Sequence, residues 1–249
     1  MTEFTLEIAT HAVAVRAFFD GSRAYCRDYL TDRSPELTLE ITREDLLLER
    51  EKNAETDRFE GQPVRNLSDA QLEITAIQRK LTQAFFAWDM ILFHGSAIAV
   101  DGEAYLFAAK SGTGKSTHTR LWREVLGDRA LMVNDDKPFL HITDEGVQVC
   151  GSPWNGKHRL GSNTSLPLRA ICLLERGEQN EIRKISAGEA LPVLLQQSAR
   201  PVDGKLLPKY LELLDGLTRY ADFYHLRCNM HPEAAKISFE AMSGSSLDT

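Results

Sequence analysis

The chain has 249 residues, of which 43% are hydrophobic and 26% are charged, and its formal net charge is −7. This length and composition are typical of a globular protein with one large core or two small ones. No apolar run approaches the ~20 residues that span a membrane, and the acidic balance gives no general attraction to nucleic acid or anionic lipid. We therefore expect neither nucleic acid nor a membrane as a partner, and the oligomeric state stays open.

The four cysteines are Cys26, Cys150, Cys172 and Cys228. They lie far apart and form no C-x-x-C pair, so their spacing predicts neither a zinc site nor a disulfide scaffold. The first ten residues, MTEFTLEIAT, lack the basic start of a secretory signal. A cytoplasmic location is the expectation that follows.

Residues 1–65 are predicted to form a small N-terminal α+β lobe. Short strands are expected at Thr5–Ile8, Val13–Arg16 and Leu37–Ile41, and a charged helix at Arg43–Glu55. No residue of this lobe forms a recognisable catalytic pattern. We interpret it as a lobe that covers one side of the core, with help in holding a substrate as the alternative.

A long helix and a hairpin come next. Ser68-Asp69-Ala70-Gln71 is a capping-box pattern that predicts a helix from Asp69 to about Met90, with one broad apolar face. A strand is expected over Ile91–Val100. Asp101-Gly102 then favours a two-residue turn, and Glu103–Ala108 is the returning strand. His94 therefore lies at the start of an antiparallel hairpin.

A phosphate-binding loop is predicted where this hairpin ends. The strand Tyr105–Ala108 precedes a glycine-rich turn, and a helix is expected over Thr117–Leu126. Backbone N–H groups of such a turn surround phosphate oxygens, and the helix N-terminus adds partial positive charge. The usual pattern opens on glycine, and Ala109 stands there instead. The predicted nucleotide-binding residues are Ser111, Gly112, Thr113, Gly114, Lys115, Ser116 and Thr117.

Within that loop, Lys115 is expected to reach the β- and γ-phosphates and the Ser116 hydroxyl to bind Mg²⁺. About twenty residues later the apolar run Ala130–Val133 predicts a strand that leads to Asp135 and Asp136. One carboxylate there suits Mg²⁺, and the other can accept a proton from an attacking hydroxyl. A solvated turn before Pro138 is the alternative.

A second predicted hairpin, His141–Cys150, leads into a loop, Gly151–Arg159, that ends in Lys157-His158-Arg159. In an acidic protein this basic cluster indicates an anionic partner. Lys157 or Arg159 is expected to neutralise charge that develops in phosphoryl transfer, and a solvated loop is the alternative.

The remainder of the chain is predicted to alternate strands and helices, so that residues 66–249 form one nucleotide-binding core. The expected elements are strands at 166–174, 182–185 and 223–228 and helices at 186–198, 206–220 and from 231 onward. Antiparallel hairpins that lead into the loop favour a mixed α+β sheet over a fully parallel one.

The order of motifs resembles the HPr kinase/phosphorylase family and its small relatives. The residues that carry the likeness are His94-Gly95, Ser111 to Ser116, and Asp135-Asp136. The resemblance implies a phosphoenolpyruvate carboxykinase-type nucleotide-binding fold, with a mixed sheet and a P-loop. It also implies ATP and Mg²⁺ as cofactors, Asp135 as the general base with His94 beside it, and Asp136 as the carboxylate on the metal side.

The function expected from sequence is an ATP-dependent kinase that phosphorylates an alcohol, most simply a serine hydroxyl. The acceptor stays open among a peptide, a protein and free serine. Two alternatives stay open as well: a non-catalytic nucleotide-binding regulatory module, and an ATPase in which water replaces the alcohol.

Overall fold

The computed structural model describes residues 1–110 and 112–247, and the chain divides into two compact units, Met1–Ala84 and Phe85–Thr249. The boundary expected from sequence, between residues 65 and 66, falls in the connection before helix α3 (Asp69–Phe85). That helix is counted almost wholly with the first unit here. A functional division of the chain at residue 65 stays a prediction.

The first unit is built on a three-stranded sheet in the order β1-β2-β3, in which β1 and β2 form a hairpin and β3 runs parallel to β2. Phe4, Leu6 and Ile8 are buried on one face of β1, because successive side chains of a strand point to opposite faces. Its elements are β1 (Thr2–Ile8), β2 (His11–Ala17), α1 (Asp20–Tyr25), η1 (Arg27–Tyr29), β3 (Leu37–Glu40), α2 (Arg43–Phe59) and α3.

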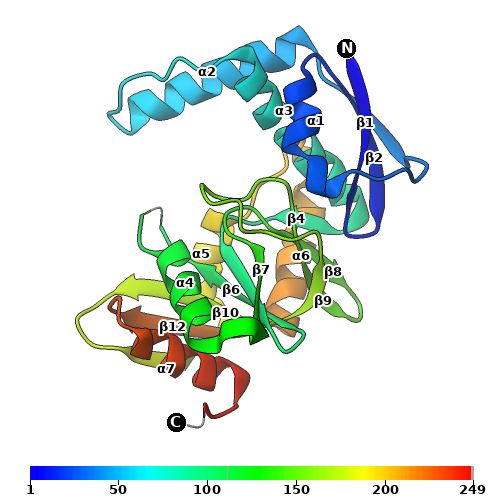
Figure 1. Cartoon of the computed structure of the whole chain (residues 1–249). Helices are drawn as coiled ribbons and strands as arrows, with labels where there is room; N and C mark the ends of the chain where they lie inside the picture. Colours follow the sequence, from blue (N-terminus) through cyan, green and yellow to red (C-terminus); the bar gives the residue numbers. More distant parts are fainter. Residues whose placement is uncertain (111, 248–249) are drawn as a thin grey trace. The chain divides into compact units, whose positions relative to one another are not determined.

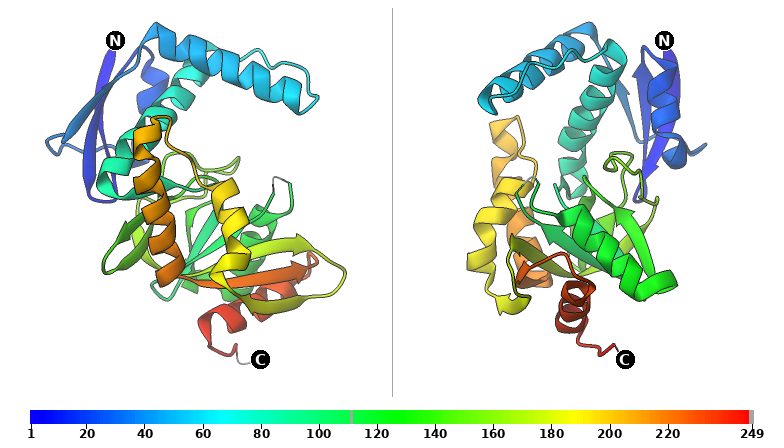
Figure 2. Two further views of the ribbon diagram at one scale, coloured as in Figure 1. Left: turned by 180° about the vertical axis from the view of Figure 1, so that it is seen from behind. Right: turned by 60° about the vertical axis from the view of Figure 1, so that its left-hand side comes forward.

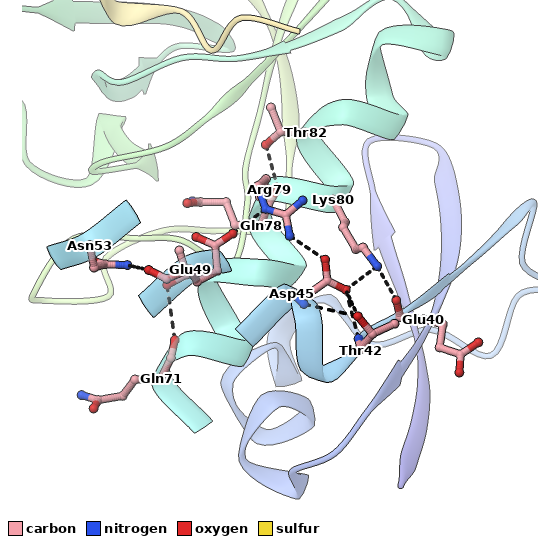
Figure 3. A network of polar contacts seen from close by, with 11 residues as sticks. Glu40, Thr42, Asp45, Glu49, Asn53, Gln71, Gln78, Arg79, Lys80 and Thr82 are labelled. Atoms are coloured by element: carbon pink, nitrogen blue, oxygen red, sulfur yellow. Dashed lines mark hydrogen bonds and ion pairs between the residues drawn. The ribbon is translucent and has the colours of Figure 1, made fainter. Parts of the chain in front are cut away.

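An ionic network joins α2 to α3 in this unit (Figure 3). Asp45 Oδ1 accepts from Arg79 Nη2 at 2.6 Å, and Asp45 Oδ2 lies 2.5 Å from Lys80 Nζ. Arg79 also pairs with Glu49. Burial alone would raise the pKa of Asp45, but the bonds from Lys80, Thr42 and Arg79 outweigh it and lower the pKa to about 2. Asp45 and Glu49 are buried and both pair with Arg79, so loss of Arg79 would leave both carboxylates with fewer partners and destabilise the unit.

The second unit is a nine-stranded mixed sheet. Its main order is β4-β8-β9-β10-β6-β5-β7, and β12 pairs with β10 and with β11. The elements are η2 (Phe86–Trp88), β4 (Met90–Leu92), β5 (Ser96–Val100), β6 (Glu103–Ala108), α4 (Lys115–Leu126), η3 (Gly127–Arg129), β7 (Ala130–Asn134), β8 (Phe139–Thr143), β9 (Gly146–Cys150), β10 (Ser165–Arg176), β11 (Glu181–Ile185), α5 (Ala187–Gln197), η4 (Gly204–Leu206), α6 (Leu207–Tyr220), β12 (Asp222–Cys228) and α7 (Pro232–Ser243).

Helices cover both faces of this sheet. Along β6, Leu106 belongs to the apolar cluster that includes residues of α5 and α6, whereas Tyr105 and Phe107 belong to the cluster of α4 and α7. Figure 1 shows α4 and α7 on one face, and the rear view in Figure 2 shows α5 and α6 on the other. A strand buried on both faces explains why β6 reads as a continuous apolar run.

Strand direction brings several loop ends to one edge of the sheet. β10 runs parallel to β6, and β12 runs parallel to β10. β7 is antiparallel to β5, which is itself antiparallel to β6, so β7 also points the same way as β6. The residues that follow these four strands therefore emerge at the same edge. Ligands of open α/β sheets usually bind at this carboxyl edge.

Two expectations about the elements between 69 and 100 were wrong in detail. The helix ends at Phe85 rather than near Met90, because a 3₁₀ turn follows and Asp89 takes a left-handed conformation with φ 56°. The expected strand over Ile91–Val100 is two strands, β4 and β5. β4 pairs with β8, whereas β5 pairs with β6 and β7, so the chain must turn between them.

Several local predictions are confirmed. The sheet is mixed, and Asp101 and Gly102 form the β5–β6 turn with φ of 52° and 88°. The Ser68 capping box is present, since Gln71 N donates to Ser68 Oγ at 3.4 Å and Ser68 N donates to Gln71 Oε1 at 3.0 Å. None of the described helices is long and apolar enough to cross a membrane.

Candidate active site

The glycine-rich turn joins β6 to α4 with the backbone that its sequence requires. Gly112 has φ 75° and Gly114 has φ 123°, conformations that residues with a Cβ rarely adopt. Gly114 is the N-cap of α4, so the helix begins directly at Lys115. The first N–H groups of a helix have no partner within the helix, and here they lie at the carboxyl edge of the sheet. Ser111 lies outside the described residues.

Arg176, the last residue of β10, holds this turn in place. Its Nε donates to the carbonyl of Thr113 at 3.2 Å, and its Nη2 donates to the carbonyl of Gly112. The N–H of Thr113 donates to the carbonyl of Lys110 at 3.2 Å, and the two bonds from Arg176 fix the peptide planes of the turn. Sixty-odd residues separate these partners in sequence, so only the pairing of β10 with β6 brings them together.

A cavity of about 560 Å³ lies beside the turn. It is the place where most of the predicted site residues meet. The residues that line it are His94, Gly112, Gly114, Lys115, Ser116, Thr117, Asp135, Asp136, Gly156, Lys157 and His158. The cavity therefore has a cationic and hydroxyl-bearing wall from α4 and an acidic wall from the segment after β7.

Asp135 is almost fully buried, at 7% exposure, and one of its oxygens is already engaged. Ser96 Oγ donates to Asp135 Oδ1 at 2.7 Å and also lies 2.9 Å from Thr119 Oγ1. The other oxygen faces Gly156, where a Cβ would stand only 3.3 Å from Oδ2. The arrangement fixes the carboxylate through Oδ1, and the glycine keeps side-chain atoms away from Oδ2.

Asn134 shapes the turn that presents the acidic pair. Its Oδ1 accepts from the backbone N–H of Asp136 at 2.8 Å and of Lys137 at 2.7 Å. Its Nδ2 donates to the carbonyl of Ser152 at 3.0 Å. The side chain is completely buried. It thus ties the acidic turn to the loop that carries Lys157.

His94 and Asp136 lie next to each other on the acidic wall. His94 Nε2 is 3.4 Å from Asp136 Oδ1, and Lys137 Nζ is 4.0 Å from the same oxygen. Burial is the main cause that lowers the pKa of His94 to about 4, and the charges of Lys137 and Lys115 contribute to the same shift. His94 is therefore neutral at pH 7, and its contact with Asp136 joins an uncharged imidazole to a carboxyl group.

The remaining charges of the site are perturbed mainly by burial. Burial raises the pKa of Asp136, and Lys137 and Lys115 oppose that rise. Burial likewise lowers the pKa of Lys115 and of Lys137, partly offset by Asp136. Lys115 Nζ donates to the carbonyl of Ala109 at 3.2 Å. Poorly solvated charges of both signs that face one cavity are typical of functional sites.

Two predicted residues lie away from this cavity. Thr113 lines a second cavity, which also borders the turn. Arg159, whose backbone has φ 49°, does not line the 560 Å³ cavity, although Lys157 does. The roles assigned to Lys157 and Arg159 stay predictions.

Sequence reasoning did not identify four residues that organise the site: Ser96, Asn134, Lys137 and Gly156. Asn134 and Lys137 flank the acidic pair, and that adjacency was a usable signal. Ser96 is 39 positions from Asp135 and is an ordinary strand residue in sequence. Only the pairing of β5 with β7, which sets Ala97 opposite Asn134, brings it to the carboxylate.

The donor set suits a magnesium ion. Mg²⁺ prefers one or two carboxylate or hydroxyl oxygens together with phosphate oxygens, and Ser116 and Asp136 offer such oxygens to the same cavity. No group of three or more His, Cys, Asp or Glu side chains among the described residues could hold a metal ion alone. Any magnesium here would complete its coordination with phosphate oxygens or water.

Fold and site together define a mixed α/β protein in which a glycine-rich strand–loop–helix turn faces an acidic pair across a cavity. Residues 63–212, more than half of the chain, match the family model described as SynChlorMet cassette protein ScmC. The chain belongs to this family. No curated protein matches it.

Among solved structures, the chain is similar to the Hpr(Ser) kinase/phosphatase from Coxiella burnetii. The two are 15% identical, and the similarity covers 49% of this chain and 93% of the other at a TM-score of 0.30.

Proposed function

We propose that this protein is an ATP-dependent kinase that transfers the γ-phosphate of ATP to an alcohol, most simply the hydroxyl of a serine. One observation carries the proposal: Lys115 and Ser116 line the same cavity as Asp135 and Asp136. A phosphoryl transfer needs a cationic grip on the phosphates and a carboxylate that takes the proton of the nucleophile. Both stand in this cavity.

Asp135 is the proposed general base. Its Oδ1 is held by Ser96, so Oδ2 remains to accept the proton of the acceptor hydroxyl. The acceptor oxygen then forms a bond to the γ-phosphorus as the bond from that phosphorus to the β–γ bridging oxygen breaks, and ADP leaves. A base whose position is fixed in advance lowers the entropy cost of reaching the reactive geometry.

Charge on the transferred group is balanced by the opposite wall. Lys115 contributes an ammonium that burial leaves poorly solvated, which strengthens its attraction to phosphate oxygens. Ser116 and Asp136 would hold Mg²⁺, whose chemistry is to neutralise charge on the β- and γ-phosphates. Lys157 lines the same cavity from an exposed loop. That loop is the proposed side of approach for the acceptor.

The acceptor is proposed to be a serine-containing peptide, a protein or free serine, with the cytoplasm as the expected compartment. Its access is consistent with the exposure of Lys157 and His158 at the mouth of the cavity. An ATPase and a non-catalytic binding module are the competing functions. Release of ADP separates all three, because only a kinase needs an acceptor to release it efficiently.

The test compares the parent with Lys115→Ala, Asp135→Asn and Asp136→Asn, using Mg-ATP with and without serine-containing acceptors. We expect Asp135→Asn to lower acceptor-dependent ADP release by about 10²-fold or more while the Kd for ATP stays within about twofold. Lys115→Ala should weaken ATP binding itself.

Acceptor-independent release by the parent would favour the ATPase, and binding without any release would favour the module. If Asp136→Asn loses transfer and Asp135→Asn does not, the two carboxylates have exchanged roles. If ATP fails to bind the parent at millimolar magnesium, the proposed function is wrong.

A further inference from the structure

A second cavity of about 430 Å³ borders the glycine-rich turn. Its walls come from α4, from the end of β10 and from the segment after β12. Among the residues that line it are His118, Leu121, Leu174, Cys228 and Met230. Neither the acidic pair nor Lys115 lines this cavity, so it lies outside the proposed site of phosphoryl transfer.

The two cavities meet at the turn. Gly112, Gly114 and Thr117 line both of them. A ligand whose anionic end lies at the turn in the larger cavity can therefore extend past Gly114 into the smaller one. The volume of about 430 Å³ falls within the roughly 300–1,000 Å³ of pockets that bind small organic molecules.

Much of the wall is apolar and suits an uncharged group, although Glu175 and Arg176 also line the cavity. Leu121 and Leu174 supply apolar surface, and Met230 is a flexible thioether at the rim with 76% exposure. Burial lowers the pKa of His118 to about 4, so its ring is neutral at pH 7. The guanidinium of Arg176 is occupied by two loop carbonyls. The cavity offers little to a second anion.

His118 is also a rigid wall. Its ring packs edge-on against Phe107, with centroids 4.7 Å apart, and its Nε2 lies 3.0 Å from Ser238 Oγ. Its Nδ1 has no hydrogen-bond partner among the described residues. A cavity walled mainly by apolar surface, with a few polar side chains among its lining residues, is typical of small-molecule sites.

We propose that this cavity binds the base and sugar of the nucleotide whose phosphates lie at the turn. The phosphoryl donor is then a nucleoside triphosphate and not pyrophosphate or another inorganic polyphosphate. This inference rests on the proposed function, since it concerns the donor for the same reaction. It goes further because Lys115 would bind the phosphates of a nucleoside triphosphate and of an inorganic polyphosphate equally well.

Cys228 provides a reporter that needs no mutation. It lines the cavity and is partly exposed, whereas Cys26, Cys150 and Cys172 are buried. Burial raises the pKa of the Cys228 thiol, so modification is best measured at mildly alkaline pH, where more thiolate is present. The experiment follows alkylation of Cys228 by iodoacetamide with mass spectrometry, in the presence of saturating Mg-ATP or Mg-tripolyphosphate.

We expect ATP to slow alkylation of Cys228 by about tenfold or more and tripolyphosphate to leave the rate unchanged. ATP should also bind at least about tenfold more tightly than tripolyphosphate in calorimetry. Met230→Ala should weaken ATP binding roughly threefold and tripolyphosphate binding not at all. The matched control is Leu207→Ala, another exposed apolar side chain, outside both cavities.

The outcomes separate the two proposals. If ATP and tripolyphosphate bind equally well and Cys228 reacts at the same rate with either, the inference about the nucleoside is overturned while the phosphate site stands. If both protect Cys228 equally, the inference is also overturned. If neither compound binds, the proposed function fails and the inference fails with it.

Discussion

Protonation of His118 should destabilise the second unit as the pH falls. The ring is 3% exposed and is surrounded by Phe107, Trp122 and the hydroxyl of Ser238. Burial is the cause that lowers the pKa of His118 from 6.5 to about 4. No carboxylate contributes to the shift. A proton on this ring would place a charge in an apolar environment.

The size of the effect follows from the two pKa values. Because the folded-state pKa lies below the unfolded-state value of 6.5, the unfolded chain takes up the proton first as the pH falls. The contribution of the neutral His118 ring to stability is fully present above pH 6.5 and is lost progressively down to about pH 4. Between about pH 7 and about pH 4.5, protonation of His118 in the unfolded chain lowers the free energy of unfolding by about 2–3 kcal/mol, the equivalent of nearly two pKa units.

The assay uses the position of the tryptophans. All three of them, Trp88, Trp122 and Trp154, lie in the second unit, so intrinsic fluorescence follows the unfolding of that unit. The free energy of unfolding is measured in urea at both pH values for the parent and for His118→Phe. Phenylalanine keeps a ring against Phe107 and cannot titrate.

The quantity compared is the drop in unfolding free energy between the two pH values. We expect the drop to be about 2 kcal/mol smaller in His118→Phe than in the parent. Any constant cost of losing the bond to Ser238 cancels in that difference. His94 and the carboxylates titrate in both proteins and cancel as well. Equal drops in the two proteins would refute the claim that His118 is buried in its neutral form.

The remaining predictions concern the acidic wall. Ser96→Ala removes the donor to Asp135 Oδ1, so we expect the rate of phosphotransfer to fall about tenfold or more. The Kd for ATP, measured by calorimetry, should be unchanged. Unaltered transfer would count against Ser96 as a positioning residue. Lys137→Met removes a charge that lowers the pKa of His94, so that pKa should rise above about 4 yet stay below 6.5, since burial is the larger cause. Titration of the His94 ring protons by NMR measures it, with the exposed Lys205→Met as control; no rise would contradict the electrostatic account.

The local features of the site could be predicted from sequence because each depends on a few adjacent residues. Gly112 and Gly114 indicated a turn that needs positive φ, and both adopt it. Asp101-Gly102 indicated a tight hairpin for the same reason, and it is present. An apolar run before the acidic pair indicated a strand, and β7 ends at the preceding residue, Asn134.

The end of the long helix shows where local pattern was insufficient. Apolar residues at helical spacing continued to Trp88, yet the helix stops at Phe85. Asp89 then adopts a left-handed conformation and the chain enters β4, whose three residues pair with β8 some fifty positions later. That pairing is a long-range interaction, and it overrides helix propensity.

The sequence by itself determined the parts: a glycine-rich turn at the start of a helix, an acidic pair after a strand, and hairpins incompatible with a fully parallel sheet. Only the tertiary structure decided which parts meet. The parallel direction of β6, β7, β10 and β12 sends their ends to one edge, where Ser96 reaches Asp135 and Arg176 reaches the turn. Strand pairing is set by the burial of whole faces, and no short stretch of residues encodes it.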